Sequence, residues 1–393
     1  MRASILLEDG THLEGVGHGV QGECVGEFVF NTAMTGYEEV LTDPSYRGQI
    51  VVFTTSHIGN TGITLDDSES SGLQAAAFVC KEFSPVSDNQ RTRESLQEYL
   101  VRMNKFAVSG IDTRYLTRVL RERGCMLGIV SLTDHKKESL LRKLKEAAPM
   151  ENNSTLWQPT GNGCDENLPN ATATGTATAT VNPNAIAEVV PERFRVAVID
   201  FGIKKGIVQN LRQQGCQVQF FAPPFLASDI EAIQPDGLFL SNGPGDPRLL
   251  LENAILRREL LALVQKYPTF GICLGHQILA LLFEGSVGKL QFGHHAINHP
   301  VKVVRDTKGN TVQERVWITS QNHNYHVIEN SIAKNFVVTH VHGNDATVAG
   351  MRHRWLPVFS VQFHPESNPG PHDATLLFRD FANLMEDFHA STN

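Results

Sequence analysis

The hydrophobic pattern of the first 150 residues mixes short strands with amphipathic helices. Asp9-Gly10 separates two short apolar runs, which is a strong hairpin signal. Four apolar runs predict strands, at 4–7, 12–16, 27–31 and 49–55. Apolar residues recur at helical spacing in three later stretches, at 96–103, at 116–120 before the stop signal Gly124, and at 140–144. We therefore expect a mixed α/β N-terminal domain.

In the second half of the chain, strand-like and helical patterns alternate. Strands are predicted at 196–200, 216–221, 237–241 and 269–273. Helices are predicted between and after them, at 204–213, 252–265 and 276–283. This alternation is typical of an α/β fold with a doubly wound, mainly parallel sheet.

The last quarter of the chain has apolar runs with few helices between them, at 300–305, 315–319, 336–340 and 358–363. We expect these runs to extend the sheet with antiparallel strands. A closing helix carries apolar residues at spacings of 4, 3 and 4, namely Leu377, Phe381, Leu384 and Phe388. Its apolar stripe should cover the sheet.

A change in composition divides the two halves. Residues 171–180 consist only of Ala, Thr and one Gly, which cannot form a core. A glycosylated stalk is the alternative for such a Thr-rich segment, but it requires secretion. We predict an N-terminal domain at 1–150, a flexible low-complexity linker at 151–192 and a C-terminal domain at 193–393.

Composition narrows the classes of function. Charged residues make up 19% of the 393 residues and the net charge is -8, so no global basic field would hold nucleic acid or an anionic membrane. Glu8, Asp9 and Glu14 occupy the region where a secretory signal would need an apolar core. We expect a cytoplasmic protein. Its six cysteines are scattered singly, so neither disulfides nor structural zinc are expected.

Gly271-Ile272-Cys273-Leu274-Gly275 has the form of a nucleophile elbow, in which a residue at a tight strand-to-helix turn is lifted out of the sheet. The glycines are needed because a β-carbon on either side would collide with the neighbouring strand or helix. A helix N-terminus also favours the thiolate that attacks. The alternative is a buried structural cysteine.

A cysteine nucleophile needs a base, and His364-Pro365-Glu366 follows an apolar strand. Pro365 favours an extended conformation at His364, and residues two apart in extended chain project to the same side. Glu366 can therefore orient the imidazole and stabilise its protonated form. An exposed turn is the alternative for this segment alone.

Ser241 to Pro247 (SNGPGDP) forms a second loop at a strand end. It lacks the length and the lysine of a phosphate-binding P-loop. The backbone N–H groups of Gly243 and Leu274 are candidates for an oxyanion hole, although a plain turn is also compatible with the loop.

Two further patterns are weaker. Gly17, Gly19 and Gly22 match a dinucleotide fingerprint, but the residues that follow predict a strand instead of a helix. His294, His295 and His299 resemble metal ligands, but no carboxylate or thiol stands at a matching spacing. We favour a structural or interface role for these histidines and expect no metal.

The C-terminal half resembles the class I (triad) glutamine amidotransferases through GICLGHQ at 271–277 and HPE at 364–366. Several segments resemble more narrowly the small, glutaminase subunits of carbamoyl-phosphate synthetases: SNGPGDP (241–247), FGHH (292–295), NHPV (298–301), QNH (321–323) and PGPHDA (369–374). Three N-terminal segments resemble that subunit family alone: FNTAMTGYEEVLTDPSY (30–46), HIGN (57–60) and SGIDTRYLTRVLRERG (109–124). The resemblance covers nearly the whole chain apart from the linker.

This resemblance implies the sheet of the class I amidotransferases and hydrolysis of L-glutamine through a thioester on Cys273. Ammonia would pass to a separate large subunit, which would make carbamoyl phosphate from bicarbonate for arginine and pyrimidine biosynthesis. No cofactor is implied in this chain, and Mg-ATP is expected in the large subunit. The residues implied around glutamine are Ser45, Gly243, Gly245, Leu274, Gln277, Asn322, Asn324 and Tyr325.

The sequence departs from the family pattern at three places: Asn324-Tyr325 for Gly-Phe, Ala296-Ile297 for Gly-Gly, and Ser367-Asn368 for Ala-Ser. Asn324 can still adopt the left-handed backbone that the glycine would, but its side chain is expected to crowd the amino end of the substrate. Two other functions are alternatives to this one. A catalytically silent scaffold subunit is disfavoured by the intact Cys273, His364 and Glu366, and a stand-alone cysteine hydrolase would not need Gln277 or the N-terminal domain.

Overall fold

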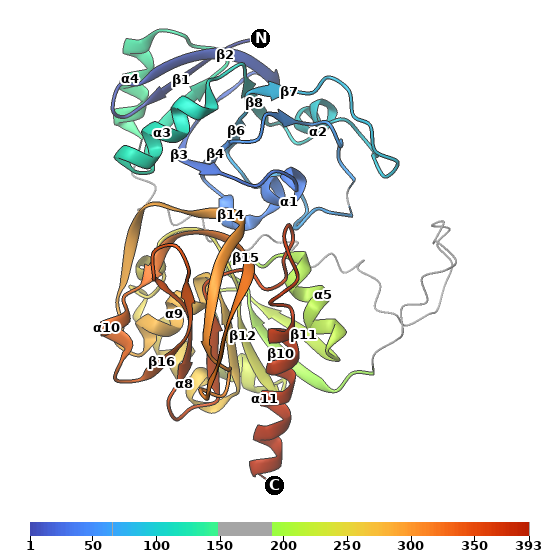
Figure 1. The fold of residues 1–393 in the computed structure, drawn as a ribbon, viewed down its shortest axis with the longest axis vertical. Coiled ribbons are helices and arrows are strands. Elements are labelled where there is room, and N and C mark those ends of the chain that lie inside the picture. Colours follow the sequence, from blue (N-terminus) through green and yellow to red (C-terminus); the bar gives the residue numbers. More distant parts are fainter. Residues whose placement is uncertain (65, 148–190, 393) are drawn as a thin grey trace.

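The computed structural model describes residues 1–64, 66–147 and 191–392. The predicted linker falls almost entirely outside these residues. In Figure 1 the N-terminal part, blue to teal, lies above the C-terminal part, green to red, and α1 (Tyr37–Thr42) lies at their junction.

The N-terminal part is built on a closed barrel of seven strands in the order β1-β2-β8-β6-β4-β3-β9. The strands are β1 (Arg2–Leu7), β2 (His12–Gly19), β3 (Glu23–Asn31), β4 (Gln49–Phe53), β6 (Ala77–Val79), β8 (Phe106–Ser109) and β9 (Met126–Ser131). β5 (His57–Ile58) and β7 (Glu82–Phe83) form a separate pair. The predicted hairpin is confirmed, since Leu6 of β1 pairs with His12 of β2.

The predicted N-terminal helices are also confirmed, as α2 (Leu96–Arg102), α3 (Thr113–Arg123) and α4 (Lys137–Glu146). Gly124 directly follows α3 as its C-cap, and its φ of 99° favours glycine. Closure into a barrel was not foreseen. It depends on parallel pairings of β4 with β3 and β6, and of β6 with β8, between segments distant in the sequence.

The C-terminal part contains a nine-stranded sheet in the order β11-β10-β12-β13-β18-β17-β16-β14-β15. The first five strands in this order are parallel, and the remaining pairings are antiparallel. The strands are β10 (Phe194–Ile199), β11 (Cys216–Phe221), β12 (Gly237–Leu240), β13 (Thr269–Ile272), β14 (Val287–Arg305), β15 (Thr311–Val327), β16 (Phe336–His342), β17 (Val348–His353) and β18 (Val358–Val361). The predicted doubly wound sheet with an antiparallel extension is confirmed, although β17 was missed.

Helices cover both faces of this sheet. They are α5 (Lys205–Gln213), α6 (Ala227–Glu231), α7 (Pro247–Leu250), α8 (Ala254–Lys266), α9 (Leu274–Leu282), α10 (Glu329–Ile332) and α11 (Leu376–Thr392). Residues of α5 and α11 pack in one hydrophobic cluster, and residues of α8 and α9 pack in another. The closing helix therefore covers the sheet as expected, but Phe378 and Met385 join Leu377 and Phe381 in its core, and Phe388 does not.

Candidate functional site

The elbow at Cys273 has the predicted geometry. β13 ends at Ile272 and α9 begins at Leu274, so Cys273 stands between them with φ 53° and ψ -102°. A non-glycine residue with positive φ is strained, and such strain persists only where the surroundings impose it. A β-carbon on Gly271 would lie 2.9 Å from the carbonyl carbon of Gly275. One on Gly275 would collide with the Leu240 carbonyl oxygen, so both glycines are required by space.

The Cys273 side chain lies beneath the antiparallel extension of the sheet. It is 2% exposed, and its Sγ donates a hydrogen bond to the backbone carbonyl of Asn322 on β15 at 3.5 Å. The five cysteines among the described residues are all free thiols.

His364 and Glu366 pair as the sequence predicted. β18 ends at Val361, three residues before His364, but the His364 backbone N–H donates to the Ser320 carbonyl at 2.9 Å and so fixes the segment against β15. The Nδ1 atom of His364 lies 2.6 Å from Glu366 Oε1, and both side chains are buried. The Nε2 atom of His364 is buried without a hydrogen-bond partner in the part of the chain that the structure describes.

The charges around this pair favour its ionised form. Burial by itself lowers the pKa of His364, but the Glu366 carboxylate and the Cys273 thiol beside it outweigh burial and raise that pKa above its ordinary value. Burial raises the pKa of Glu366, but the charges of Lys204 and His364 outweigh it and hold that pKa below its ordinary value.

Lys204 is a site residue that sequence reasoning missed. Its Nζ donates to Glu366 Oε1 at 2.8 Å and to the Asn368 carbonyl at 2.5 Å, and it lies 3.9 Å from Glu69 Oε2. The Lys204 side chain is 2% exposed, so this is a buried ion pair. Lys204 directly precedes α5, at the helix end where a cation is unfavourable. This position is a weak hint in the sequence that the lysine pairs with an acidic residue elsewhere.

The loop after β12 approaches the elbow closely. A β-carbon on Gly243 would lie 2.6 Å from the Phe201 carbonyl oxygen and 2.9 Å from Leu274 Cδ2, and Gly245 has φ +87°. Leu274 is the first residue of α9, so its N–H has no acceptor within the helix. The two residues predicted for the oxyanion hole therefore lie side by side at the elbow.

One cavity is lined by most of the residues expected around glutamine. It is lined by Ser45, Gly243, Gly245, Cys273, Gln277, Asn322, Asn324 and Tyr325. It is also lined by residues that were not predicted, namely Glu27, Arg47, Gln49, Asp246, Lys289, His295 and His323. Leu274 is not among the lining side chains. His364 lines a smaller adjoining cavity with Lys204 and Asn322.

The N-terminal half supplies one wall of this cavity. Ser45, in the short helical turn η1 (Pro44–Tyr46), accepts a hydrogen bond from Asn242 Nδ2 at 2.9 Å. Asp43 Oδ2 accepts one from Asn322 Nδ2 at 2.8 Å. The expected approach of Ser45 from the N-terminal part is therefore present.

Asn324 does not use the left-handed backbone that glycine would allow. Asn324 lies within β15 and is absent from the described residues with positive φ, so it does not take a left-handed backbone. Its amide is instead held between two neighbours: Nδ2 donates to Glu27 Oε2 at 2.7 Å, and Oδ1 lies 2.8 Å from His295 Nε2. Extended backbone suits asparagine, so no glycine is needed here.

The other departures have local roles. Ser367 has φ 62°, and the carbonyl of Asn368 accepts the hydrogen bond from Lys204. Ala296 is buried in β14.

Gly17 and Gly19 lie in β2, and β3 follows Gly22, so no helix opens after these glycines and the dinucleotide fingerprint is excluded.

No helix in the described parts of the chain is both long and apolar enough to cross a membrane.

Comparisons with known proteins match both halves of the chain. A family model described as "Glutamine amidotransferase class-I" matches residues 197–384, and one described as "Carbamoyl-phosphate synthase small chain, CPSase domain" matches residues 5–130. Three similar proteins, each named carbamoyl phosphate synthase small chain, come from Clostridium perfringens, Aquifex aeolicus and Thermus thermophilus. Their identities to this chain are 43%, 40% and 42%; the alignments cover 97%, 98% and 100% of this chain and 99%, 99% and 95% of the respective proteins.

Proposed function

This chain belongs to the carbamoyl phosphate synthase small chain family, the glutamine-hydrolysing side of that enzyme, and from that premise we propose that Cys273 forms a thioester with glutamine and that the released ammonia passes to a large subunit. The observation that carries the proposal is the convergence of three separate segments on two adjoining cavities, one lined by Cys273 and Ser45 and the other by His364. Cys273 stands on a strained elbow, the His364–Glu366 pair is buried beside it, and Ser45 reaches the cavity of Cys273 from the N-terminal half.

Covalent catalysis here begins at the thiol. Cys273 first gives its proton to His364 Nε2, which the raised pKa of His364 favours, and the resulting thiolate attacks the side-chain carbonyl carbon of glutamine. The oxygen that gains negative charge is stabilised by the N–H groups of Gly243 and Leu274. His364 then returns the proton to the leaving nitrogen, the C–N bond breaks, and ammonia departs from a thioester on Cys273.

Hydrolysis of the thioester repeats these steps with water. His364 takes a proton from the water as it attacks the thioester carbon, and it gives the proton to the departing sulfur. Glutamate is released and the thiol is restored. An imidazolium forms in both halves of the reaction, and the adjoining Glu366 charge, itself held by Lys204, stabilises it.

The charges of the cavity suit a zwitterionic amino acid. Arg47 and Lys289 contribute positive charge to its wall, and Glu27 and Asp246 contribute negative charge. Glu27 is held by the Lys289 ammonium at 2.9 Å and by Asn324. A neutral ester or peptide substrate would not need both signs of charge, which supports free glutamine as the substrate.

The partner in this proposal is a large subunit that binds Mg-ATP and bicarbonate and makes carbamoyl phosphate for arginine and pyrimidine biosynthesis in the cytoplasm. No cofactor is proposed for the reaction at Cys273. Family membership argues against a stand-alone cysteine hydrolase.

A catalytically silent scaffold is tested by measuring glutamate release from glutamine by the purified complex. Release that disappears on alkylation of Cys273 supports the proposal, and no release by the intact complex contradicts it.

A further inference from the structure

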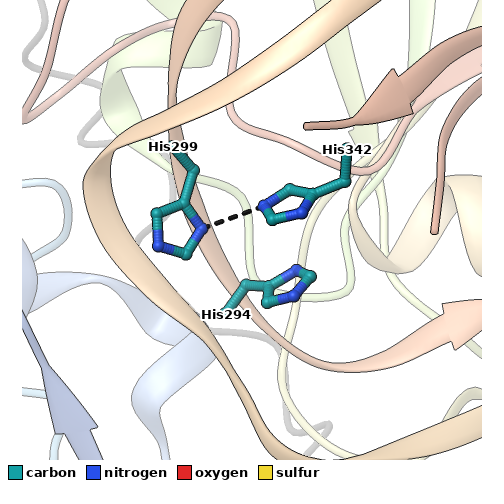
Figure 2. A group of neighbouring side chains, drawn as sticks. All are labelled: His294, His299 and His342. Carbon is teal, nitrogen blue, oxygen red and sulfur yellow. Dashed lines mark hydrogen bonds between the residues drawn. The ribbon is translucent and has the colours of Figure 1, made fainter. Parts of the chain in front are cut away.

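Three histidine side chains meet beside the β14–β15 pair. His294 and His299 lie on β14, and His342 ends β16 (Figure 2). One ring nitrogen from each lies within 4.8 Å of the others. The Nε2 atom of His342 and the Nδ1 atom of His299 are hydrogen-bonded at 3.0 Å.

A carboxylate that the sequence pattern did not reveal orients two of these rings. Asp345, in the turn after β16, places Oδ1 2.8 Å from His342 Nδ1 and Oδ2 2.7 Å from His294 Nε2. A carboxylate accepts an N–H from each imidazole, which leaves lone pairs on His342 Nε2 and His294 Nδ1. Metal-binding histidines are usually oriented in this way, by a carboxylate on the nitrogen that does not touch the metal.

His294 Nδ1 is the second observation that points to a ligand. It is buried and has no hydrogen-bond partner within the described ranges, and the side chain as a whole is 7% exposed. A buried acceptor without a partner is costly, and a bound cation would satisfy it.

We propose that His294 Nδ1, His299 Nδ1 and His342 Nε2 bind one divalent transition-metal ion of the zinc type, with water at the fourth position and Asp345 as the orienting carboxylate. Three imidazoles without oxygen ligands select zinc, cobalt, nickel or copper over magnesium or calcium. Bonds of about 2.0–2.1 Å in a tetrahedral site separate the nitrogens by roughly 3.3 Å. The His299–His342 pair is already near that separation.

Metal binding requires two changes. His299 Nδ1 donates its proton to His342 Nε2 in the hydrogen bond between them, so His299 must carry that proton on Nε2 instead before both nitrogens can bind the ion. The rings of His294 and His342 are stacked, with centroids 4.0 Å apart and planes 11° apart. Their lone pairs therefore run parallel, and the rings must tilt toward each other to share an ion. The half-buried His299 and the Asp345 carboxylate, which is 37% exposed, give the ion a side from which to enter.

Neighbouring histidines do not belong to this site. His295 pairs with Asn322 and Asn324 on the side of the glutamine cavity, so the predicted grouping of His294, His295 and His299 is divided by the strand. Both ring nitrogens of His323 are already engaged, with the Tyr325 carbonyl and Gln321 Oε1. None of the three proposed ligands lines the glutamine cavity, but the His323 ring, which does, packs against His294 with ring centroids 4.9 Å apart.

Cobalt(II) titration of the chelator-stripped protein tests the proposal, because four-coordinate cobalt has intense visible absorption bands. All variants are made in a Cys273→Ser background, so that the catalytic thiol cannot bind the ion. We expect one cobalt per chain, displaced by zinc and not by magnesium. His299→Asn and His342→Asn should abolish the bands, and Asp345→Asn should weaken binding about 10- to 100-fold.

The matched control is His57→Asn, which removes an exposed histidine of β5 that pairs with Glu82 far from the cluster; it should bind cobalt normally. Circular dichroism establishes that each variant is folded. If His342→Asn does not fold, the half-buried His299 and the exposed Asp345 still decide the question. Absence of stoichiometric binding by the Cys273→Ser parent, or unchanged binding by folded His299→Asn, would overturn the proposal.

Discussion

Replacing Lys204 with methionine removes the buried charge that faces Glu366 while keeping a side chain of similar length. Lys204 Nζ lies 2.8 Å from Glu366 Oε1, and the two side chains are 2% and 0% exposed. Breaking a buried pair by removing one partner costs about 3–5 kcal/mol, because the other charge is left buried and uncompensated. At about 2–4 °C per kcal/mol for a part of roughly 200 residues, the melting temperature should fall by about 6–20 °C.

The pH dependence of stability gives this prediction a sign. The folded state holds the pKa of Glu366 below the ordinary value of 4.5, so its contribution to stability is present above about pH 4.5 and is lost as pH falls through the lowered folded pKa. Without Lys204 the folded pKa rises, and acid unfolding should begin at a higher pH. The imidazolium of His364 would also be less well oriented, so kcat for glutamine hydrolysis should fall while KM changes little.

Lys205→Met is the matched control, since the neighbouring Lys205 is partly exposed and its Nζ makes a long hydrogen bond of 3.5 Å to the Asp66 carbonyl. Thermal melts between pH 4 and 8 and steady-state glutaminase assays compare the two variants. If Lys204→Met melted and unfolded in acid like Lys205→Met, the buried ion pair would not have the role assigned to it.

Three further substitutions test the reacting groups and the elbow. His364→Asn should abolish thioester formation, whereas Glu366→Gln, which removes an orienting group, should reduce it less. Trapping the acyl-enzyme with labelled glutamine measures both effects. Equal losses would indicate that Glu366 takes a direct part in the reaction. Gly275→Ala should destabilise the chain by about 1–3 kcal/mol and reduce activity, because its β-carbon would collide with the Leu240 carbonyl oxygen; a denaturant titration with an unchanged midpoint would refute the packing argument.

Local sequence patterns were sufficient for the elbow and for the pairing of His364 with Glu366. Gly271 and Gly275 are required because neighbouring segments pass too close to leave room for a β-carbon, and both lie within the five-residue motif around Cys273. His364 and Glu366 are two residues apart, so their pairing depends on backbone conformation alone. The strand and helix order of the C-terminal half followed from periodicity for the same reason.

Contacts between distant segments could not be predicted in this way. Lys204 meets Glu366 across 162 residues, and Asp345 meets His294 across 51. Closure of the barrel likewise depends on strand pairings such as β4 with β6, whose register no local pattern specifies. Lys204 and Asp345 acquire their roles from partners that lie close to them only in the folded chain.

The most direct test of the central claim uses Cys273→Ser assembled with the large subunit. Serine is nearly isosteric, but its hydroxyl is far harder to deprotonate than a thiol, so His364 should scarcely activate it. Carbamoyl phosphate formation is measured separately from glutamine and from ammonium chloride. The glutamine-dependent rate should fall by about three or more powers of ten while the ammonium-dependent rate persists; retention of the glutamine-dependent rate would contradict Cys273 as the nucleophile, and loss of both rates in an assembled complex would contradict the delivery of ammonia to a separate subunit.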